Sequence, residues 1–269
     1  MIITKREFEQ IKKHKPGERF NLKLDFGLTL VSVLRGDSQA IINDNISLKL
    51  DEKIKDKFCY ILDDQEVRKI DFFSDSTNRY YKLTPTPDWP TFSISSVPMH
   101  KLSSPKADTE AKISLIKPFG VVLDTCMGPG YTAILASKKA KKIITFEKDL
   151  NIITLAQANP ISAPLFKADN IEISYGDVFQ EIKALKSNYF DCIIHDPPTL
   201  KMAPLLFSSD FYLSLKRVLK DRGRFFHYTP LYKIKQGYDF PAKVKVKLKK
   251  AGFKNIDYSS RAGGFLCQK

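Results

Sequence analysis

The stretch IIHDPPTL, residues 193–200, combines groups that can hold an amino group. Two isoleucines are typical of the end of a buried strand, and Asp196 then stands directly before Pro197 and Pro198. Proline fixes the backbone and ends strand pairing, so this turn is rigid. A carboxylate and a fixed main-chain carbonyl at a strand end can together accept the hydrogens of an amino group. The alternative is that the two prolines serve only to end the strand.

A second set of residues lies in LDTCMGPGYTA, residues 123–133. Asp124 closes an apolar run, and Gly128 and Gly130 follow before a helix is expected to begin near Tyr131. Glycine tolerates positive φ and lets the backbone approach a ligand closely. The fragment GPGYTA also fits the dinucleotide fingerprint G-x-G-x-x-A, which is a weak indication by itself. A glycine turn that serves only packing is the alternative.

Two further acids follow later strand-like runs. Glu147 ends KIITFE, nineteen positions after Gly128, where an acid accepts hydrogen bonds from ribose hydroxyls. Asp177 and Val178 follow IEISYG. An acid there can reach an adenine amino group while the apolar side chain packs on the ring. The ordered series from Asp124 through Glu147 to Asp177 therefore predicts a binding site for an adenosine.

Alternating strands and helices must position these residues. From about residue 106, apolar runs rich in Val, Ile and Phe alternate with helical stretches. This pattern predicts an α/β domain with a doubly wound, mostly parallel, seven-stranded sheet. Ligands bind beyond the carboxyl ends of the strands in such sheets. A short turn between the last two runs, at residues 261–264, predicts an antiparallel terminal strand at one edge.

Three regions are expected along the chain. Residues 1–90 predict a small accessory module that is mostly β after a short helical start, with a turn at Asn43-Asp44-Asn45. Residues 91–105 read as a structured linker, because proline restricts it and apolar side chains within it need burial. Residues 106–269 form the α/β domain.

Positive charge is concentrated in the C-terminal part. Residues 111–269 contain 26 Lys and Arg against 13 Asp and Glu, whereas residues 1–110 contain 18 against 17. Such an excess favours an anionic partner, most commonly nucleic acid, and a solvated lysine-rich surface is the alternative. The lysines expected to form a phosphate-binding rim are Lys138, Lys139, Lys141, Lys142, Lys233, Lys235, Lys243, Lys245, Lys247, Lys249 and Lys250.

Other classes of protein are disfavoured by composition. The apolar runs are far shorter than the ~20 residues that a membrane span needs, and the N-terminus has no signal-peptide pattern. The cysteines are scattered without a C-x-x-C pair, which favours a reducing cytoplasm and predicts neither disulfides nor a metal site. They are Cys59, Cys126, Cys192 and Cys267.

The motifs DTCMGPGYT, TFEKD, GDVF and IIHDPP resemble the successive motifs of class I S-adenosylmethionine-dependent methyltransferases over residues 106–269. More narrowly, the chain resembles a group of archaeal methyltransferases with DTCxGxGYT, IIHDPP and FHYT, and this likeness extends upstream into residues 91–100. The resemblance implies S-adenosylmethionine as cofactor, with Asp124, Gly128 and Gly130 at its methionine part, Glu147 at the ribose and Asp177 at the adenine. The further cofactor contacts that it implies are Cys126, Tyr131, Thr132, Lys148 and Val178.

Within that family, enzymes that modify exocyclic base amines carry Asp, Asn or Ser, then two prolines and an aromatic residue, at the end of the fourth strand. Asp196, Pro197 and Pro198 are accordingly predicted to be catalytic. The implied activity is methyl transfer to RNA, ribosomal RNA or tRNA, most specifically to cytidine N4 of ribosomal RNA. Thr199 replaces the aromatic residue, so stacking must come from elsewhere. The residues predicted to bind substrate are His195, Thr199, Phe207 and Tyr228. The alternative for Tyr228 is packing at a strand end, and the alternative for His195 is that it only orients Asp196 or caps the strand.

Four other functions remain open. An aminopropyltransferase of the spermidine synthase type shares this fold and a related cofactor, but usually has a GGGDG loop and acids that hold a cationic amine. A protein or small-molecule methyltransferase needs the same cofactor site. A dinucleotide-dependent oxidoreductase would leave Asp124 and the Asp196 turn without a role. The last is a binding protein with a vestigial cofactor pocket.

Overall fold

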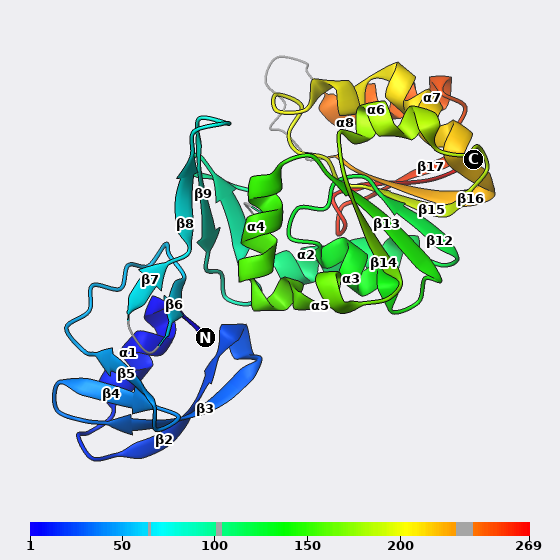
Figure 1. The fold of residues 1–269 in the computed structure, drawn as a ribbon. Helices are drawn as coiled ribbons and strands as arrows, with labels where there is room; N and C mark the ends of the chain where they lie inside the picture. Colours follow the sequence, from blue (N-terminus) through cyan, green and yellow to red (C-terminus); the bar gives the residue numbers. More distant parts are fainter. Residues whose placement is uncertain (64–65, 101–103, 230–238) are drawn as a thin grey trace. The chain divides into compact units, whose positions relative to one another are not determined.

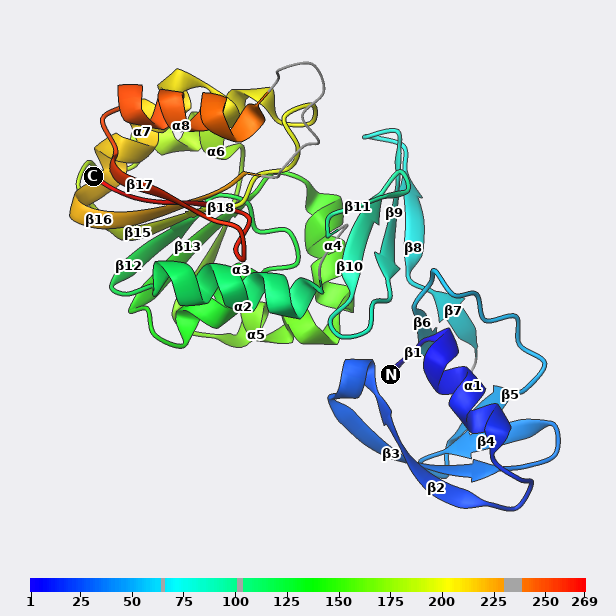
Figure 2. The same cartoon turned by 180° about the vertical axis from the view of Figure 1, so that it is seen from behind.

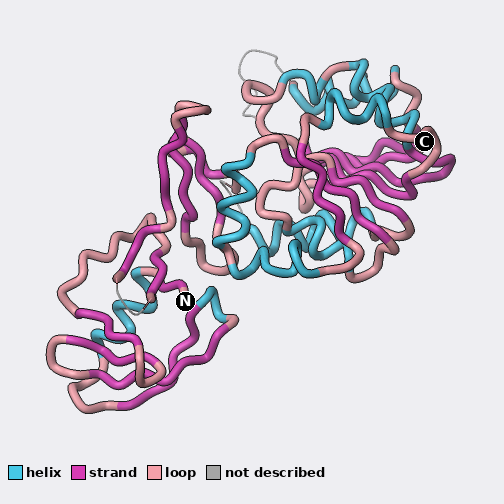
Figure 3. The backbone as a smooth tube through the Cα atoms, in the orientation of Figure 1, coloured by secondary structure: helices cyan, strands magenta, loops and turns pink. Residues whose placement is uncertain are grey.

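The computed structural model describes residues 1–63, 66–100, 104–229 and 239–269 (Figure 1). The chain divides into two compact units, Met1–Pro105 with Thr154–Ala163, and Lys106–Ile153 with Pro164–Lys269. Figure 3 shows that strands dominate the N-terminal part, whereas helices and strands alternate in the C-terminal part. The secondary structure therefore changes character along the chain as the sequence predicts.

The N-terminal unit contains helix α1 (Lys5–Lys13) and small antiparallel sheets. The Thr4 hydroxyl accepts a hydrogen bond from the Arg6 N–H at 3.3 Å, and the Glu7 carboxylate accepts one from the Thr4 N–H at 3.0 Å. This capping box satisfies N–H groups that the first helical turn leaves free. One sheet joins β1 (Ile2–Ile3), β6 (Tyr60–Leu62) and β7 (Val67–Lys69), and another joins β2 (Arg19–Leu24), β3 (Thr29–Arg35), β4 (Gln39–Ile42) and β5 (Ile46–Lys49).

The turn between β4 and β5 lies where the sequence predicts it. Asn43 and Asp44 have φ values of 49° and 60°, and the Asn45 N–H donates to the Ile42 carbonyl at 3.2 Å. Hairpin turns with positive φ match the twist of the strands, and Asn and Asp adopt such φ values more readily than other side chains. The core of this part is formed by residues that include Ile3, Phe8, Ile11, Val31, Val33, Ile42 and Leu48.

A further four-stranded antiparallel sheet has the order β11-β10-β9-β8. Its strands are β8 (Asp71–Ser74), β9 (Arg79–Thr84), β10 (Thr91–Ile94) and β11 (Val97–Pro98). The segment 91–105, expected as a structured linker, thus contributes two strands. Phe92 in β10 pairs with Leu83 in β9 and is fully buried. These residues belong to a sheet of the N-terminal unit, which ends at Pro105 in this part of the chain.

The C-terminal unit contains the predicted seven-stranded sheet, in the order β14-β13-β12-β15-β16-β18-β17. Strands β12 to β16 pair in parallel, which confirms the mostly parallel sheet. The antiparallel last strand, β18, lies between β16 and β17 and not at the expected edge, because both neighbours hydrogen-bond to it. The strands are β12 (Val121–Asp124), β13 (Lys142–Glu147), β14 (Ile171–Tyr175), β15 (Phe190–His195), β16 (Leu219–Tyr228), β17 (Lys254–Ser259) and β18 (Gly264–Gln268).

Helices cover both faces of this sheet. Figures 1 and 2 show α6, α7 and α8 together on one face, and α2, α3 and α5 on the other. The helices are α2 (Pro105–Ile116), α3 (Tyr131–Ser137), α4 (Leu150–Ala158), α5 (Ala163–Lys167), α6 (Val178–Glu181), α7 (Ser209–Val218) and α8 (Phe240–Lys250). Short 3₁₀ segments are η1 (Asp25–Gly27), η2 (Pro160–Ser162), η3 (Ile182–Ala184) and η4 (Pro204–Phe207). The doubly wound α/β class is confirmed.

An apolar core joins the sheet to α7 and α8. Leu215 of α7 and Val244 and Leu248 of α8 are buried in one cluster with Ile193 and Phe225 of the sheet. Burial of each such side chain contributes roughly 1.5–3 kcal/mol. Val244 and Leu248 lie four residues apart on α8, so both face the core from the same side of the helix. This packing fixes the strand ends that carry the site.

Candidate active site

The predicted site residues gather at the carboxyl edge of the parallel strands. The strand order reverses between β12 and β15, and ligands of doubly wound sheets bind at such a point. Thr125, directly after β12, donates its N–H to the carbonyl of Ile194 in β15 at 3.0 Å. Asp124 and Asp196 therefore follow from neighbouring strand ends.

The turn after β12, Gly128–Gly130, has a backbone that requires glycine. Gly128 has a φ of 52° and Gly130 a φ of 78°. A Cβ on Gly130 would lie 2.5 Å from Leu165 Cδ2, so neither the conformation nor the packing accommodates a side chain. Of its neighbours, Cys126 is half-buried and Tyr131 is buried. The turn brings main chain, and few side chains, to this strand end.

Asp124 lies beneath this turn and is fully buried. Its carboxylate accepts hydrogen bonds from the Thr145 hydroxyl at 2.7 Å and from the buried Thr132 hydroxyl at 3.3 Å. Burial raises the pKa of Asp124 to about 8, and nearby Asp196 adds to the rise while the two hydroxyls oppose it. The site is therefore poised to gain a negative charge when a positive group arrives.

Glu147 is fixed beside the same turn by backbone donors. Its Oε2 accepts from the Gly128 N–H at 3.2 Å, and its Oε1 accepts from the N–H groups of Lys148 and Asp149 at 2.9 and 3.0 Å. Burial raises the pKa of Glu147, and these N–H groups oppose the rise. Oε1 already accepts two hydrogen bonds and Oε2 only one, so Oε2 can still accept a hydrogen bond from a hydroxyl.

Asp177 is the N-cap of α6. Its Oδ1 accepts from the Phe179 N–H at 3.0 Å, and its Oδ2 lies 3.4 Å from Lys148 Nζ. The neighbouring Val178 is buried. Asp177 thus stands at the end of β14, next to the strand that ends in Glu147. The three predicted cofactor acids follow three adjacent strands.

Asp196 is held by a lysine that the sequence analysis did not single out. Lys112 Nζ in α2 lies 2.6 Å from Asp196 Oδ2 and 2.6 Å from Asp108 Oδ2. Among the described residues, neither Asp196 Oδ1 nor the carbonyl of Pro197 accepts a hydrogen bond. Pro197 is buried and Pro198 is exposed. The Asp196 turn therefore presents two acceptors that await a donor.

The Lys112 ammonium also contacts an aromatic ring. Its Nζ lies over the ring of Tyr228, 4.4 Å from the centroid, and the lysine side chain is 3% exposed. Burial lowers the pKa of Lys112, but the carboxylates of Asp196 and Asp108 outweigh it, so the pKa is raised overall. Lys112 therefore stays charged within the protein.

His195 lies under Asp196 and does not reach solvent. Its Nε2 lies 3.0 Å from the Leu206 carbonyl, which can only accept, so Nε2 carries the proton. Its Nδ1 then accepts from the Thr125 hydroxyl at 2.7 Å. Burial, followed by the nearby His227, lowers the pKa of His195 well below its ordinary value. A neutral ring thus links the ends of β12 and β15.

His227 pairs with His195 across β15 and β16, with ring centroids 4.6 Å apart. Its Nδ1 donates to the Tyr228 carbonyl at 2.7 Å, and its Nε2 accepts from the Tyr212 hydroxyl at 2.8 Å. Burial lowers the pKa of His227 to about 4. Both rings are therefore neutral and fully hydrogen-bonded, which rigidifies the strand ends beneath the site.

The residues predicted to bind substrate fall into two groups. His195 and Phe207 are buried and support the strand ends from the core. Thr199 and Tyr228 are half-buried, and one face of the Tyr228 ring carries the Lys112 ammonium. Of the two groups, only Thr199 and Tyr228 are exposed enough to contact a substrate directly.

The lysines of the predicted phosphate-binding rim differ in their surroundings. Lys142 pairs with Glu172 at 2.7 Å, and Lys247 donates to the Phe207 carbonyl at 2.8 Å. Outside the described residues lie Lys233 and Lys235. The exposed members are Lys138, Lys139, Lys141, Lys243, Lys245, Lys249 and Lys250.

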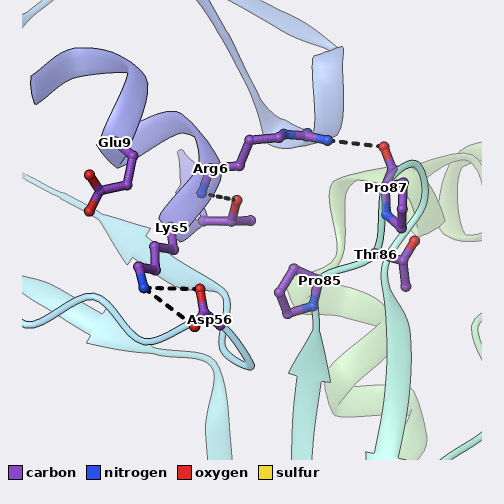
Figure 4. Close-up of a pocket in the computed structure, with 8 residues that line it drawn as sticks. Lys5, Arg6, Glu9, Asp56, Pro85, Thr86 and Pro87 are labelled. Atoms are coloured by element: carbon purple, nitrogen blue, oxygen red, sulfur yellow. Dashed lines mark hydrogen bonds and ion pairs between the residues drawn. The ribbon is translucent and has the colours of Figure 1, made fainter. Parts of the chain in front are cut away.

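A cavity of about 500 Å³ lies in the N-terminal unit (Figure 4). Lys5 at its wall pairs with Asp56 at 3.2 Å, and Arg6 donates to the Pro87 carbonyl at 3.0 Å and pairs with Glu7 at 2.7 Å. Its basic side chains therefore already have partners. None of the predicted site residues lines it.

Neither a membrane-spanning helix nor a metal-binding cluster is found among the described residues. Within residues 1–63, 66–100, 104–229 and 239–269, no helix is long and apolar enough to cross a membrane. In the same ranges, no three of His, Cys, Asp and Glu come together in a way that could hold a metal ion. All four cysteines have free thiols.

The chain is similar in sequence to a known protein family and to an archaeal protein. Residues 119–200 match the family described as RNA cap guanine-N2 methyltransferase. This segment spans the strand ends from Asp124 to the Asp196 turn. An uncharacterized protein of Methanocaldococcus jannaschii is 42% identical over 216 residues, which cover 78% of this chain and 73% of that protein.

Solved structures share the fold. A spermidine synthase bound to the transition-state analogue AdoDATO has a TM-score of 0.57 at 19% identity, over 76% of this chain and 75% of that one. The Thermotoga maritima spermidine synthase has a TM-score of 0.56 at 16% identity, over 95% and 81%. MnmC2 from Aquifex aeolicus has a TM-score of 0.52 at 19% identity, over 70% of each chain. At these identities the likeness concerns the fold.

Proposed function

We propose that this chain methylates an exocyclic amino group of an RNA base. The chain belongs to the family of the Methanocaldococcus jannaschii protein. It is an S-adenosylmethionine-dependent methyltransferase. The matched segment holds the glycine turn and the strand ends that a class I enzyme uses. The identity of the acceptor is the proposal.

The carboxyl edge of the sheet suits this cofactor. Glu147, held by three backbone N–H groups, accepts a hydrogen bond from a ribose hydroxyl at Oε2, and Asp177 lies one strand further for the adenine. The turn Gly128–Gly130 lets the methionine part approach the backbone. Buried Asp124 gains its charge most easily beside a cation such as the sulfonium. The remaining proposed cofactor contacts are Cys126, Tyr131, Thr132, Lys148 and Val178.

The residues at the Asp196 turn act on the acceptor amine. When bound, S-adenosylmethionine supplies a methyl group on a positively charged sulfur, which departs as a neutral thioether. An exocyclic base amine is a weak nucleophile because its lone pair is delocalised into the ring. Asp196 Oδ1 and the Pro197 carbonyl accept its two hydrogens and favour a pyramidal nitrogen. On methylation the nitrogen would have to release one proton, which Asp196 Oδ1 would accept and pass to solvent.

One observation carries the proposal. Asp196 Oδ1 and the carbonyl of Pro197 accept no hydrogen bond from the described residues, although Pro197 is buried. A buried acceptor ordinarily has a donor, and the Asp196 side chain, which is 21% exposed, leaves Oδ1 open to one. An amino group, with two N–H donors on one atom, matches two acceptors that adjoin along the chain.

RNA is the proposed partner. Residues 111–269 carry 26 Lys and Arg against 13 Asp and Glu, and the matched family is described as acting on RNA. Cytidine N4 of ribosomal RNA is the favoured target and guanine N2 the second, since Asp196 can hold either conjugated amine in the same way. Thr199 and Tyr228 lie at the same strand ends for contact with the base.

The test is transfer of labelled methyl groups to RNA. Ribosomal RNA and tRNA transcribed in vitro, and ribosomal subunits, are incubated with labelled S-adenosylmethionine, digested to nucleosides and analysed by mass spectrometry. N4-methylcytidine or N2-methylguanosine is expected, and Asp196→Ala should lower the rate of its formation about 10²–10³-fold while the variant still binds cofactor. If no methyl label is transferred to any of these RNAs, the proposal is wrong.

The other readings make different predictions. An aminopropyltransferase would join decarboxylated S-adenosylmethionine to a diamine, which product analysis detects. A protein or small-molecule methyltransferase would place the label in those fractions of a cell extract. The loop CMGPG in place of GGGDG and the basic C-terminal part favour RNA. The proposed compartment is the cytoplasm, in line with the free thiols.

A further inference from the structure

Lys112 places its ammonium in a position built for a cation. Asp108 and Asp196 each lie 2.6 Å from its Nζ, and the centroid of the Tyr228 ring lies 4.4 Å away. An ammonium has three N–H donors, and two carboxylates with one aromatic face can engage all three. We call these three partners, Asp108, Asp196 and Tyr228, the ammonium seat.

The seat is filled from within the chain. A primary alkylammonium, such as the end of a diamine, would need the same carboxylates and the same ring. It would have to displace the side chain of Lys112, which is 3% exposed and forms two ion pairs at 2.6 Å. Breaking a buried ion pair is costly because it leaves charges without partners. A cationic amine is therefore kept away from Asp196.

Lys112 leaves one part of Asp196 available. The ammonium contacts Oδ2, and Oδ1 has no partner among the described residues. The positive charge of Lys112 also offsets one of the two carboxylates that it joins, so the demand for a second cation falls. What Oδ1 can still accept is a hydrogen from an uncharged amino group.

We propose that Lys112 is the specificity-determining residue of this site, which fills the ammonium seat so that Asp196 accepts a neutral amino group and excludes a cationic one. The inference deepens the proposed function and rests on it for the nature of the neutral amine. The exclusion of cations is a property of the seat, and it can be measured without any methyl transfer.

The experiment opens the seat and asks whether it binds an amine. Lys112→Ala is titrated with propylammonium chloride and with putrescine by calorimetry, with sodium chloride at equal ionic strength as the reference. Lys106→Ala is the matched control, because it removes a lysine from the same helix whose side chain is 49% exposed. Lys112→Ala is expected to bind either amine about tenfold to a hundredfold more tightly than the wild type and Lys106→Ala.

Adding Asp196→Asn to Lys112→Ala should abolish that binding. Equal amine affinity in Lys112→Ala, Lys106→Ala and the wild type, with cofactor binding intact, overturns the proposal. If Lys112→Ala does not fold, the pair Lys112→Ala with Asp108→Asn removes one charge of each sign. That pair keeps Asp196 and Tyr228, so the same gain in amine affinity is expected and its absence has the same meaning.

Methyl transfer separates this inference from the proposed function. If the wild type labels no RNA but Lys112→Ala binds amines, the proposed function fails and the seat stands. If the wild type labels RNA but opening the seat gains no amine affinity, the role of Lys112 fails and the proposed function stands. If both hold, Lys112→Ala should also label RNA more slowly, and Lys106→Ala should not.

Discussion

The carboxyl edge of the sheet has two sides that are held in different ways. On the cofactor side, formed by β12, β13 and β14, Glu147 is bound by N–H groups of the two residues that follow it. On the acceptor side, formed by β15 and β16, Asp196 pairs with Lys112, 84 residues away in the chain, and His195 pairs with Thr125, 70 residues away. The first side thus depends on shorter-range contacts, including that of Asp124 with Thr145, 21 residues away, than the second side does.

Methyl transfer should separate the two sides most clearly. Asp196→Ala removes an acceptor for the amine, and turnover is expected to fall about 10²–10³-fold while cofactor affinity is retained. Glu147→Gln turns an amide NH₂ toward backbone N–H groups, so cofactor affinity should fall about 10–100-fold while turnover at saturating cofactor is retained. Calorimetry with S-adenosylmethionine and single-turnover transfer to RNA measure the two quantities.

The control for this pair is Asp221→Ala, which removes a carboxylate that is 89% exposed and should change neither quantity. If each of the two site variants lost both cofactor affinity and turnover to a similar extent, the edge would act as one unit. The contrast between a local and a long-range side would then have no functional meaning.

The glycine turn allows a sharper test of the cofactor side. Gly130→Ala meets Leu165 at 2.5 Å at a φ of 78°, whereas Gly17→Ala meets nothing within 4 Å at a φ of 84°. Positive φ costs an alanine roughly 1–2 kcal/mol in both, and overpacking adds about 1–3 kcal/mol at the first site. Urea denaturation should therefore show the larger loss for Gly130→Ala, with weaker cofactor binding in that variant alone. Equal losses of stability in the two variants would mean that the Leu165 side chain moves aside without an energetic penalty.

The fold could be predicted because its periodicities are local, whereas strand order is not. The apolar runs that end at Asp124 and Glu147 predict buried parallel strands, whatever the order of these strands in the sheet. The insertion of β18 between β16 and β17 leaves the same apolar pattern in the sequence as an edge strand would. Prolines made residues 91–105 read as a linker, yet Pro98 lies in β11 at the edge of its sheet, where a missing N–H is tolerated.

The site follows the same division. The proposed role of Glu147 could be predicted from the sequence, because acids that bind ribose follow a glycine turn at a recurrent spacing. The role of Lys112 could not be predicted from the sequence, because a lysine four residues after Asp108 on a helix is typical of an exposed ion pair. A signal was present, because Thr109, Lys112 and Ile116 recur at helical spacing and all three are buried. A lysine within such a stripe indicates a buried cation that needs carboxylates.

The last test concerns Asp124, whose pKa is about 8 in the folded chain against an ordinary 3.8. The folded state therefore binds the proton more tightly, so the stability due to this group falls as pH rises between these values. Asp124→Asn is neutral throughout and keeps an acceptor for Thr145. Its melting temperature relative to the wild type should rise from about pH 5 to about pH 8 and then level off.

The histidines of the acceptor side have the opposite sign. His227 has a pKa of about 4 in the folded chain against an ordinary 6.5, so the stability it contributes is lost as pH falls through that window. This contribution is common to the wild type and Asp124→Asn and cancels from their difference. A positively charged cofactor favours ionised Asp124, so S-adenosylmethionine should raise the melting temperature of the wild type more than that of Asp124→Asn at pH 8. A difference that does not vary with pH would mean that the pKa of Asp124 lies near its ordinary value and that this carboxylate is already ionised without cofactor.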